Sequence, residues 1–504
     1  MRTEPGTDTG STLVEEFDLI VLGGGAVGEN VADRAVQGGL TSVIVEHELV
    51  GGECSYWACM PSKALLRSQA ALEAARRVPG AAEAVAGELD VAAVLARRDR
   101  VVGNWSDAGQ ADWVHGAGIA LVRGHGRLSG IREVTVTRAD GSTVVLVARH
   151  AVAVATGSDP LIPDIPGLRE ANPWTSRDAT SVRQVPGRLA IIGGGVVAAE
   201  MATAYAGFGA EVTLIARGDL LDGMEPFAGE QVADSLRERG VRLLLRTGTT
   251  RVARDASGVT LETSTGALVH ADEVLVATGR VPRTVGIGLE TIGLDPGSWL
   301  ETDDTLRVPG FDWLYAVGDV NHRALLTHQG KYQARAAGDV IAARANGQRV
   351  SDAPWGAHVA TADHRAVPQV TFTDPEVASV GLTAAAAAAA GLRTRVVDYE
   401  IGWVAGASLH AEGYQGRARM VVDEGRSVVV GATFVGPDVA ELVQAATIAI
   451  VGEVPLDRLW HAVPAYPTIS EVWLRLLEAY GRGSAEPASG RVSDDAWLEA
   501  SVVV

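Results

Sequence analysis

This chain has few cysteines, no long apolar run and no excess of positive charge. Only two cysteines occur in 504 residues, too few for a disulfide framework, and a cytoplasmic protein would keep such thiols for redox chemistry. No uninterrupted apolar run approaches 18 residues, so no membrane span is predicted. A net charge of −19 argues against nucleic acid or an anionic membrane surface as partner. The first 15 residues lack the apolar segment of a signal peptide, so we expect a cytoplasmic protein.

A glycine-rich unit near the N-terminus is typical of dinucleotide binding. An apolar run at residues 18–22 leads into Gly-Gly-Gly-Ala-Val-Gly, and a second apolar run at residues 41–45 ends at Glu46. The first motif glycine permits a tight turn, the second admits a pyrophosphate and the third allows close helix packing, while the acid suits a ribose hydroxyl. These motif glycines are Gly23, Gly25 and Gly28.

The unit repeats in the middle of the chain. An apolar run at residues 189–192 opens onto the glycine motif that contains Gly193 and Gly195, and the following run at residues 211–215 is succeeded by Ala216 and Arg217. No acid follows this second strand. A cation there suits the 2′-phosphate of NADP better than the bare ribose of NAD, although a solvated surface arginine is the plainer alternative. We therefore predict FAD on the first unit and NADPH on the second, with NADH possible.

The two cysteines, Cys54 and Cys59, lie five positions apart directly after the first unit. In a regular helix five residues rise about 7.5 Å, which exceeds the usual Cα separation in a disulfide. If they pair, the chain between them must be irregular, with Pro61 just downstream. The alternative is two buried, reduced cysteines that act as small apolar side chains.

With the motif Gly51-Gly52-Glu53-Cys54 through Cys59 and Lys63, the chain resembles the class I flavoprotein disulfide reductases, such as dihydrolipoamide dehydrogenase, glutathione reductase and mercuric reductase. Short Ala-Thr-Gly turns at residues 155–157 and 277–279 and the segment 315–319 strengthen the resemblance. It covers roughly residues 16 to 482. It implies an α/β fold with two Rossmann-like dinucleotide-binding domains, for FAD and NADPH, and a C-terminal α+β dimerisation domain.

The resemblance also implies roles for single residues. Cys59 would be the thiol nearest the flavin, Cys54 the thiol that meets substrate, and Glu200 the partner of Lys63. Helix amides and Lys63 would lower a thiol pKa there. The remaining implied cofactor-binding residues are Gly52, Gly126, Thr156, Gly157, Gly279, Arg280, Asp319 and Thr327.

One departure concerns the acid–base chemistry. The family places a histidine base before Pro-Thr, with a glutamate five residues later; here Tyr466 takes the place of the histidine and Glu471 is present. A tyrosine is a poor base near pH 7 but can donate a hydrogen bond. His461 is an alternative proton carrier. Mercuric reductases also have a tyrosine in this region, but they add a C-terminal cysteine pair that this sequence lacks.

Bulky residues between the cysteines form a second departure. Tyr56 and Trp57 stand where the family has small or polar residues; they either pack against the helix or narrow access to the disulfide.

The composition and the predicted secondary structure differ between segments of the sequence. We expect helices from Ala64 to about Val114 that break near Pro79-Gly80, paired strands around Asp140-Gly141, and a short helix after Thr383. The predicted boundaries are a disordered tail at 1–15, an FAD-binding domain at 16–159, an NAD(P)H-binding domain at 160–280, a return to the FAD domain at 281–355, a dimerisation domain at 356–482 and a flexible tail at 483–504.

These observations predict an NADPH-dependent FAD disulfide oxidoreductase that passes electrons to a disulfide or other electrophilic small-molecule acceptor, not lipoamide. A homodimer is expected, and no metal site. Three alternatives stay open. They are a quinone or dye reductase that acts from the flavin, a mercuric-reductase-like metal reductase, and a lipoamide-dehydrogenase-like component of a multienzyme complex.

Overall fold

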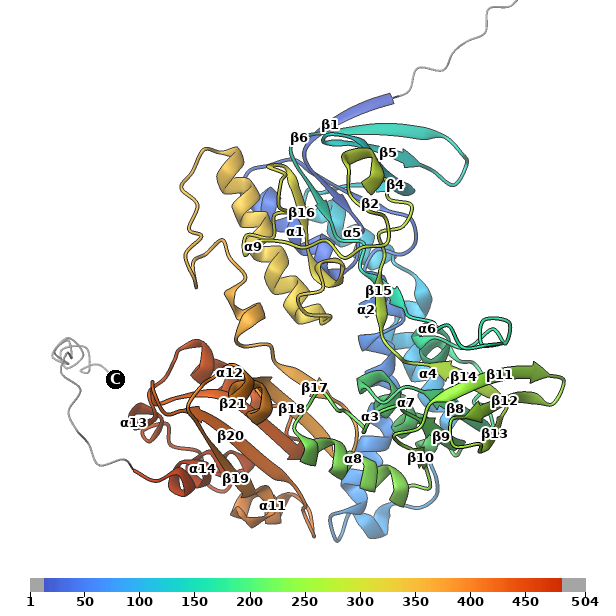
Figure 1. Cartoon of the computed structure of the whole chain (residues 1–504), viewed down its shortest axis with the longest axis vertical. Helices are drawn as coiled ribbons and strands as arrows, with labels where there is room; N and C mark the ends of the chain where they lie inside the picture. Colours follow the sequence, from blue (N-terminus) through green and yellow to red (C-terminus); the bar gives the residue numbers. More distant parts are fainter. Residues whose placement is uncertain (1–12, 483–504) are drawn as a thin grey trace, which may run out of the picture.

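The computed structural model describes residues 13–482 and contains three sheet-centred parts (Figure 1). The first part is a seven-stranded sheet in the order β3-β2-β1-β6-β5-β4, with β16 also paired to β6. Its β3, β2, β1, β6 and β16 strands are parallel, whereas β5 and β4 are antiparallel additions. The strands are β1 (Leu13–Leu22), β2 (Ser42–Glu46), β3 (Ala120–Arg123), β4 (His125–Gly130), β5 (Glu133–Thr137), β6 (Thr143–Val154) and β16 (Leu314–Ala316).

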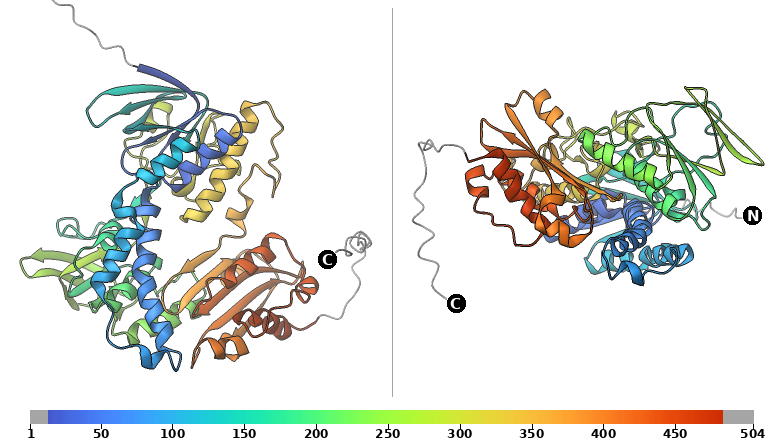
Figure 2. Two further views of the ribbon diagram at one scale, coloured as in Figure 1. Left: turned by 180° about the vertical axis from the view of Figure 1, so that it is seen from behind. Right: turned by 90° about the horizontal axis from the view of Figure 1, so that it is seen from below.

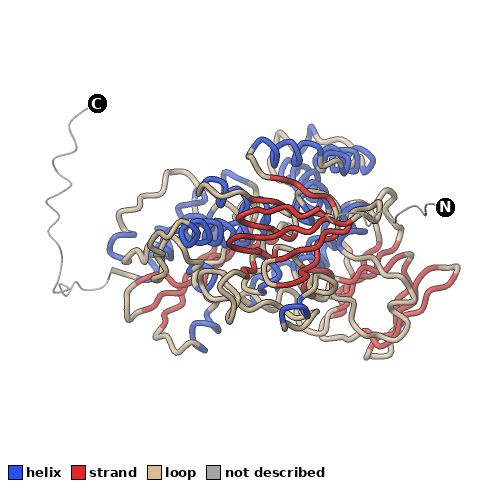
Figure 3. Tube along the Cα trace, turned by 90° about the horizontal axis from the view of Figure 1, so that it is seen from above, coloured by secondary structure: helices blue, strands red, loops and turns tan. Residues whose placement is uncertain are grey.

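Burial on both faces explains the apolar runs of the central strands. Every residue of β2 is buried, and Ile20 of β1 lies between Val43 and Val152. Helices α1 (Ala26–Gln37), α5 (Ala108–Gly116) and α9 (Thr327–Ala345) accompany this sheet, and Figure 3 shows helices beside the strands that cross the middle of the view.

The first strand begins earlier than the predicted tail boundary allowed. Leu13 and Val14 pair with Val144 and Val145 of β6, so the assignment of residues 13–15 to a disordered tail is wrong. The backbone hydrogen bonds of β6 extend far enough to order them. The rest of that tail and the tail at 483–504 lie outside the described residues.

The second part holds a parallel sheet in the order β10-β9-β8-β14 and an antiparallel sheet β11-β12-β13. A two-stranded link, β7 with β15, joins it to the first part. Its helices are α6 (Ser176–Ser181), α7 (Val196–Gly207) and α8 (Pro226–Glu238). Its strands and the link are β7 (Ser158–Pro160), β8 (Arg188–Ile192), β9 (Glu211–Ile215), β10 (Arg242–Leu244), β11 (Thr249–Asp255), β12 (Gly258–Thr263), β13 (Leu268–Ala271), β14 (Glu273–Val276) and β15 (Arg280–Pro282).

Two helices extend from the first part along the second (Figure 2). They are α3 (Cys59–Arg76), preceded by the short α2 (Gly52–Tyr56), and α4 (Val91–Val101). The predicted break near Pro79 is confirmed, since no α-helix is assigned between α3 and α4. Arg98, which is almost fully buried, anchors α4 because its guanidinium donates to the carbonyls of Thr180 and, at 2.7 Å, Val182.

The third part is an antiparallel sheet in the order β17-β18-β21-β20-β19, with Phe434 at the centre of its core. The alanine run forms a helix as predicted, and the Thr383 side chain caps it by accepting from the Ala386 amide at 3.1 Å. The strands are β17 (Gln369–Thr371), β18 (Glu376–Gly381), β19 (Thr394–Glu400), β20 (Arg417–Asp423) and β21 (Val428–Gly436). The helices are α10 (Ala384–Ala389), α11 (Ala405–His410), α12 (Leu442–Val451), α13 (Leu456–Leu459) and α14 (Val472–Tyr480).

Within residues 13–482, no helix combines the length and apolar character that a membrane crossing requires. The mixed α/β architecture with parallel cores and a separate C-terminal unit agrees with the predicted fold class.

Candidate active site

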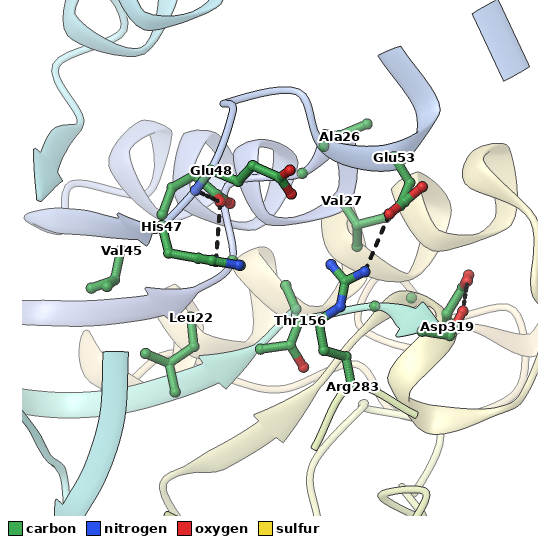
Figure 4. Close-up of a pocket in the computed structure, with 18 of the residues that line it drawn as sticks. Leu22, Ala26, Val27, Val45, His47, Glu48, Glu53, Thr156, Arg283 and Asp319 are labelled. Carbon is green, nitrogen blue, oxygen red and sulfur yellow. Dashed lines mark hydrogen bonds and ion pairs between the residues drawn. The ribbon is translucent and has the colours of Figure 1, made fainter. Parts of the chain in front are cut away.

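A cavity of about 350 Å³ opens at the carboxyl ends of β1 and β2 (Figure 4). This is where parallel α/β sheets bind nucleotides. It is lined by nine of the predicted flavin-site residues and by Cys54. The nine are Gly23, Gly25, Glu46, Gly52, Gly126, Thr156, Gly157, Asp319 and Thr327.

Close backbone approach explains the glycines of the first motif. Gly23 has φ +104°, and a Cβ there would meet the Ala155 carbonyl oxygen at 2.5 Å. A Cβ on Gly28 would lie 2.0 Å from the Gly23 carbonyl oxygen, so Gly28 serves packing and does not line the cavity. Gly25 precedes the first turn of α1. A Cβ on Gly25 would have only Gly52 nearby, with the Gly52 Cα 3.9 Å away. The helix N-terminus is thus left open to an anionic group.

The polar groups of the cavity fit an adenine dinucleotide. The buried Glu46 accepts hydrogen bonds from the Gly24 and Glu48 amides, both at 2.7 Å, which fixes the carboxylate at the end of β2. Thr156 Oγ1 is buried and has no hydrogen-bond partner among the described residues. Asp319 accepts from Ser158 Oγ at 2.5 Å. An unsatisfied hydroxyl and two oriented carboxylates give the ribose and ribityl hydroxyls of FAD partners, so the cavity fits this cofactor.

Two arginines of the cavity wall were missed by the sequence motifs. Arg177 of α6 donates through Nε to Glu53 Oε1 at 2.6 Å, and Arg283 donates to the same oxygen at 3.2 Å. Figure 4 shows Arg283 and Glu53 pointing toward one another across the cavity. These partners are more than a hundred residues apart in the chain, so no local pattern signals them. The predicted Arg280 does not line the cavity; its Nε lies 3.6 Å from Asp319 Oδ2.

The segment between the cysteines is irregular, which is the geometry that a disulfide between them would require. Helix α2 ends at Tyr56, Ala58 has φ −126° and ψ −99°, and α3 begins at Cys59. Both cysteines are free thiols in this structure and are half-buried. Cys59 Sγ lies 3.4 Å from Thr327 Oγ1, which itself lines the cavity. One thiol of the pair is therefore held at the flavin pocket by a residue from α9.

The two thiols differ in acidity. A hydrogen bond from Cys54 is the main cause that lowers the pKa of Cys59 from 9.0 to about 6, while burial opposes it and Thr327 and Lys63 assist. The same hydrogen bond, together with burial, raises the pKa of Cys54. Cys59 is therefore the thiol of the pair that forms a thiolate more readily.

An ion pair that includes Lys63 lies one turn along α3 from Cys59, on the same face of the helix. Lys63 Nζ lies 2.7 Å from Glu200 Oε2 on α7, and the Glu200 side chain is only 3% exposed. The second oxygen, Oε1, accepts from the Phe372 amide at 3.0 Å, and the Phe372 ring lies 5.0 Å from Lys63 Nζ. Two side chains that sequence reasoning paired at a separation of 137 residues are therefore in contact.

The second glycine motif lies at the carboxyl edge of the second parallel sheet, as the first motif does in the first sheet. Gly193 has φ +135°, and a Cβ there would lie 2.2 Å from the Ala277 carbonyl oxygen, while Gly195, before α7, has open space around it. Ala216 is buried and Arg217 is exposed just after β9. The parallel strands β8 and β9 end side by side, so the motif and Arg217 share one edge of the sheet. Gly279 follows β14 at this edge, with φ +137°.

The bulky residues between the cysteines pack against protein, which favours the first of the two sequence interpretations. Tyr56 is buried and donates to the Val50 carbonyl at 3.1 Å. The Trp57 ring lies 4.1 Å from the Arg177 guanidinium carbon, a cation–π arrangement.

The C-terminal residues stay apart from the cysteines within one chain. Tyr466 is 77% exposed on the third part and does not line the flavin cavity, and His461 is exposed as well. Glu471 is buried and accepts from the Gly406 and Thr468 amides, both at 3.2 Å, so it caps a helical turn. Within residues 13–482 no group of three or more histidine, cysteine or acidic side chains could hold a metal ion.

The chain matches known proteins over most of its length. The family described as pyridine nucleotide-disulphide oxidoreductase matches residues 17–340, and its dimerisation domain matches residues 367–476. A mercuric reductase of Acidithiobacillus ferrooxidans is 32% identical over 91% of this chain and 81% of its own length. A dihydrolipoyl dehydrogenase of Chlamydia muridarum is 31% identical over 91% and 96%. The crystal structure of LpdA from Mycobacterium tuberculosis covers 92% of this chain and 99% of its own, with a TM-score of 0.77 and 26% identity.

Proposed function

Because the chain belongs to the pyridine nucleotide-disulphide oxidoreductases, enzymes whose members use FAD and NAD(P)H, we propose that it passes electrons from NADPH through FAD to Cys54 and Cys59. From the thiols the electrons go to a disulfide or another electrophilic small molecule that is not lipoamide. The observation that carries this proposal is the acidic Cys59, fixed by Thr327 at the flavin cavity, with the less acidic Cys54 beside it.

FAD, when bound, supplies two-electron chemistry between the nicotinamide and the thiols. The chain's own residues would hold it: Glu46 toward a ribose, the open amides of α1 toward the pyrophosphate, and Asp319 and Thr156 toward hydroxyl groups. The Lys63–Glu200 pair lies on the same face of α3 as Cys59 and would tune the charge beside the flavin. Arg217 would receive the NADP 2′-phosphate, since Ala216 offers no carboxylate to a ribose.

The two thiols have different roles because they differ in acidity. The family resemblance assigns Cys59, the more acidic thiol, to the cofactor side; its Sγ contacts Thr327 Oγ1, and Cys54 itself lines the cavity. Cys54 keeps its proton and is the group that attacks an incoming acceptor once it is deprotonated. Tyr466 cannot take a proton from a dithiol substrate near pH 7, which is why dihydrolipoamide is excluded as an efficient substrate.

A homodimer is part of this proposal. The chain contains the dimerisation domain of the family. Apolar side chains are exposed on that part, with Ile448 of α12 at 60% and Val463 at 83%, close in sequence to Tyr466. An apolar surface of this kind favours association. A cytoplasmic, reducing compartment suits a catalytic thiol pair.

Anaerobic titration with NADPH tests the proposal. We expect two-electron reduction to produce a long-wavelength absorbance band that comes from the Cys59 thiolate against oxidised FAD. Cys59→Ser should abolish the band while FAD stays bound. A wild-type protein that binds FAD and consumes NADPH without this band would contradict the role of the thiols.

A further inference from the structure

Helix α6 of the second part contacts the segment between the two cysteines. Thr180 Oγ1 lies 2.8 Å from the Trp57 carbonyl oxygen and 2.9 Å from the Ser176 carbonyl oxygen of its own helix, so the two oxygens share its single proton. The Trp57 carbonyl receives no bond from Pro61, four residues later, because proline carries no amide hydrogen. Thr180 therefore supplies, from another part of the fold, a donor that the start of α3 cannot provide.

Arg177, one turn earlier on α6, holds residues on both sides of Cys54. Its Nε donates to Glu53 Oε1 at 2.6 Å, and its guanidinium carbon lies 4.1 Å from the centre of the Trp57 ring. The same guanidinium group donates to the two carboxylate oxygens of Glu48, at 2.9 and 3.0 Å. A planar cation with several donors can make these contacts together, whereas a lysine ammonium cannot.

Glu53, which directly precedes Cys54, is also held from the link between the first and second parts. Arg283, just after β15, donates to Glu53 Oε1 at 3.2 Å and through its Nε to Asp159 of β7 at 2.9 Å. The guanidinium groups of Arg177 and Arg283 therefore converge on one carboxylate oxygen. The Glu53 side chain is only 20% exposed, so these contacts fix its position at the start of the thiol segment.

Helix α6 can support the thiol segment because buried side chains hold the helix itself in place. The Tyr205 hydroxyl of α7 donates to the Ala179 carbonyl at 2.7 Å, and the Arg98 guanidinium of α4 donates to the Thr180 carbonyl. Tyr205 and Arg98 are both almost fully buried. Satisfied hydrogen bonds in such surroundings make the local structure rigid.

We infer that Arg177 and Thr180 are positioning residues that hold the Cys54–Cys59 segment in the geometry in which its two thiols can join. Their contacts with this segment are called the α6 clamp below. The inference rests on the proposed function, in which the pair alternates between disulfide and dithiol. The clamp acts through the residues that flank the thiols, because a segment already held in place loses less conformational freedom when the S–S bond forms.

Loss of the α6 clamp should shift the thiol–disulfide equilibrium toward the dithiol. When the enzyme disulfide forms, the two thiols give up two electrons and two protons, and an external disulfide takes up both and becomes a dithiol. A looser segment brings the two sulfur atoms together less often. The equilibrium constant for disulfide formation therefore falls, and the reduction potential of the pair becomes more positive.

This equilibrium constant can be measured directly in the anaerobic, FAD-bound dimer. The protein is equilibrated with mixtures of reduced and oxidised dithiothreitol, and free thiols are trapped with iodoacetamide. Mass spectrometry then gives the ratio of the alkylated peptide to the disulfide-bonded peptide. The measurement needs neither NADPH nor an acceptor, so failure of NADPH to reduce the pair would refute the proposed function and leave this equilibrium measurable.

Thr180→Val removes the hydroxyl with little change in volume. It should lower the equilibrium constant for disulfide formation about tenfold, as expected for one lost hydrogen bond, which corresponds to about 30 mV for two electrons. Thr180→Ser keeps the donor and should match wild type. Arg177→Lys keeps the charge but loses the planar donor group, so it should shift the equilibrium in the same direction as Arg177→Met does.

Arg254→Met is the matched control for Arg177→Met. Arg254 lies on β11 of the same part, its side chain is exposed to the same degree (29% against 30%), and it bonds Glu273 and the Ala171 carbonyl. Its replacement removes an equally exposed, paired arginine away from the thiol segment. The equilibrium of the thiol pair should stay at the wild-type value.

Three results would overturn the inference. The first is a Thr180→Val equilibrium that superimposes on wild type. The second is a shift in Arg254→Met as large as in Arg177→Met, which would make it a general effect of lost charge in the second part. The more exposed Arg177 carries the test if Thr180→Val does not fold, and the third result is then an Arg177→Lys equilibrium equal to wild type.

Discussion

The acidity of Cys59 gives a prediction whose size can be worked out. The hydrogen bond from Cys54 is the largest cause of the low pKa of Cys59. A hydrogen bond to a charged group contributes about 1.5–3 kcal/mol, which corresponds to about one to two pKa units. Cys54→Ala removes the donor and leaves Lys63 and Thr327 in place. The pKa of Cys59 should therefore rise from about 6 to about 7–8.

The assay is a pH titration of the thiolate–flavin absorbance band in single-cysteine variants, where Cys59 cannot form the disulfide. The band requires the thiolate, so it is present above the pKa of Cys59 and is lost as the pH falls through that value. Cys54→Ser keeps a hydroxyl donor and is the matched control; its midpoint should stay nearer 6. Equal midpoints in the two variants would refute the assignment of the low pKa to this hydrogen bond.

Three further predictions concern the nucleotide, the substrate and the assembly. Wild type should prefer NADPH, and Arg217→Glu should reverse the preference in kcat/KM; equal values for both nucleotides in wild type would remove the basis for this assignment. Tyr466→His should raise dihydrolipoamide oxidation, because loss of a positioned base typically costs about 10²- to 10⁴-fold, while quinone reduction should change little; robust wild-type lipoamide turnover that His461→Ala abolishes would instead assign the base to His461. Ile448→Asp should shift the mass from light scattering from dimer to monomer, and a wild-type monomer that is active would contradict the assembly.

Local sequence patterns were sufficient to predict the two nucleotide-binding units and the geometry of the thiol segment. Gly23 and Gly193 could be identified because a positive φ and a close carbonyl leave room only for glycine. The rise of a helix predicted an irregular turn before Cys59 if the two cysteines pair, and alanine propensity predicted the helix after Thr383. The pairing of Lys63 with Glu200 required the family resemblance, since nothing local links two residues 137 positions apart.

Other features depend on tertiary contacts that the sequence does not reveal. Arg177 and Glu53 belong to different sheet-centred parts, and only the folded chain brings them to one wall of the cavity. Glu29 reads in sequence as an ordinary first-turn acid of a helix, favoured by the helix dipole. In the folded chain its side chain is buried, at 7% exposure. The strand start at Leu13 was missed because its order comes from pairing with β6, not from its own composition.

The central claim is that electrons reach the acceptor through the thiols, and the double variant Cys54→Ser/Cys59→Ser tests it most directly. NADPH should still reduce bound FAD in this variant, and menadione should still be turned over. Reduction of dithionitrobenzoate, an aromatic disulfide, should fall to background, whereas wild type should reduce it catalytically. Disulfide turnover that persists at the wild-type rate without either thiol would contradict the account.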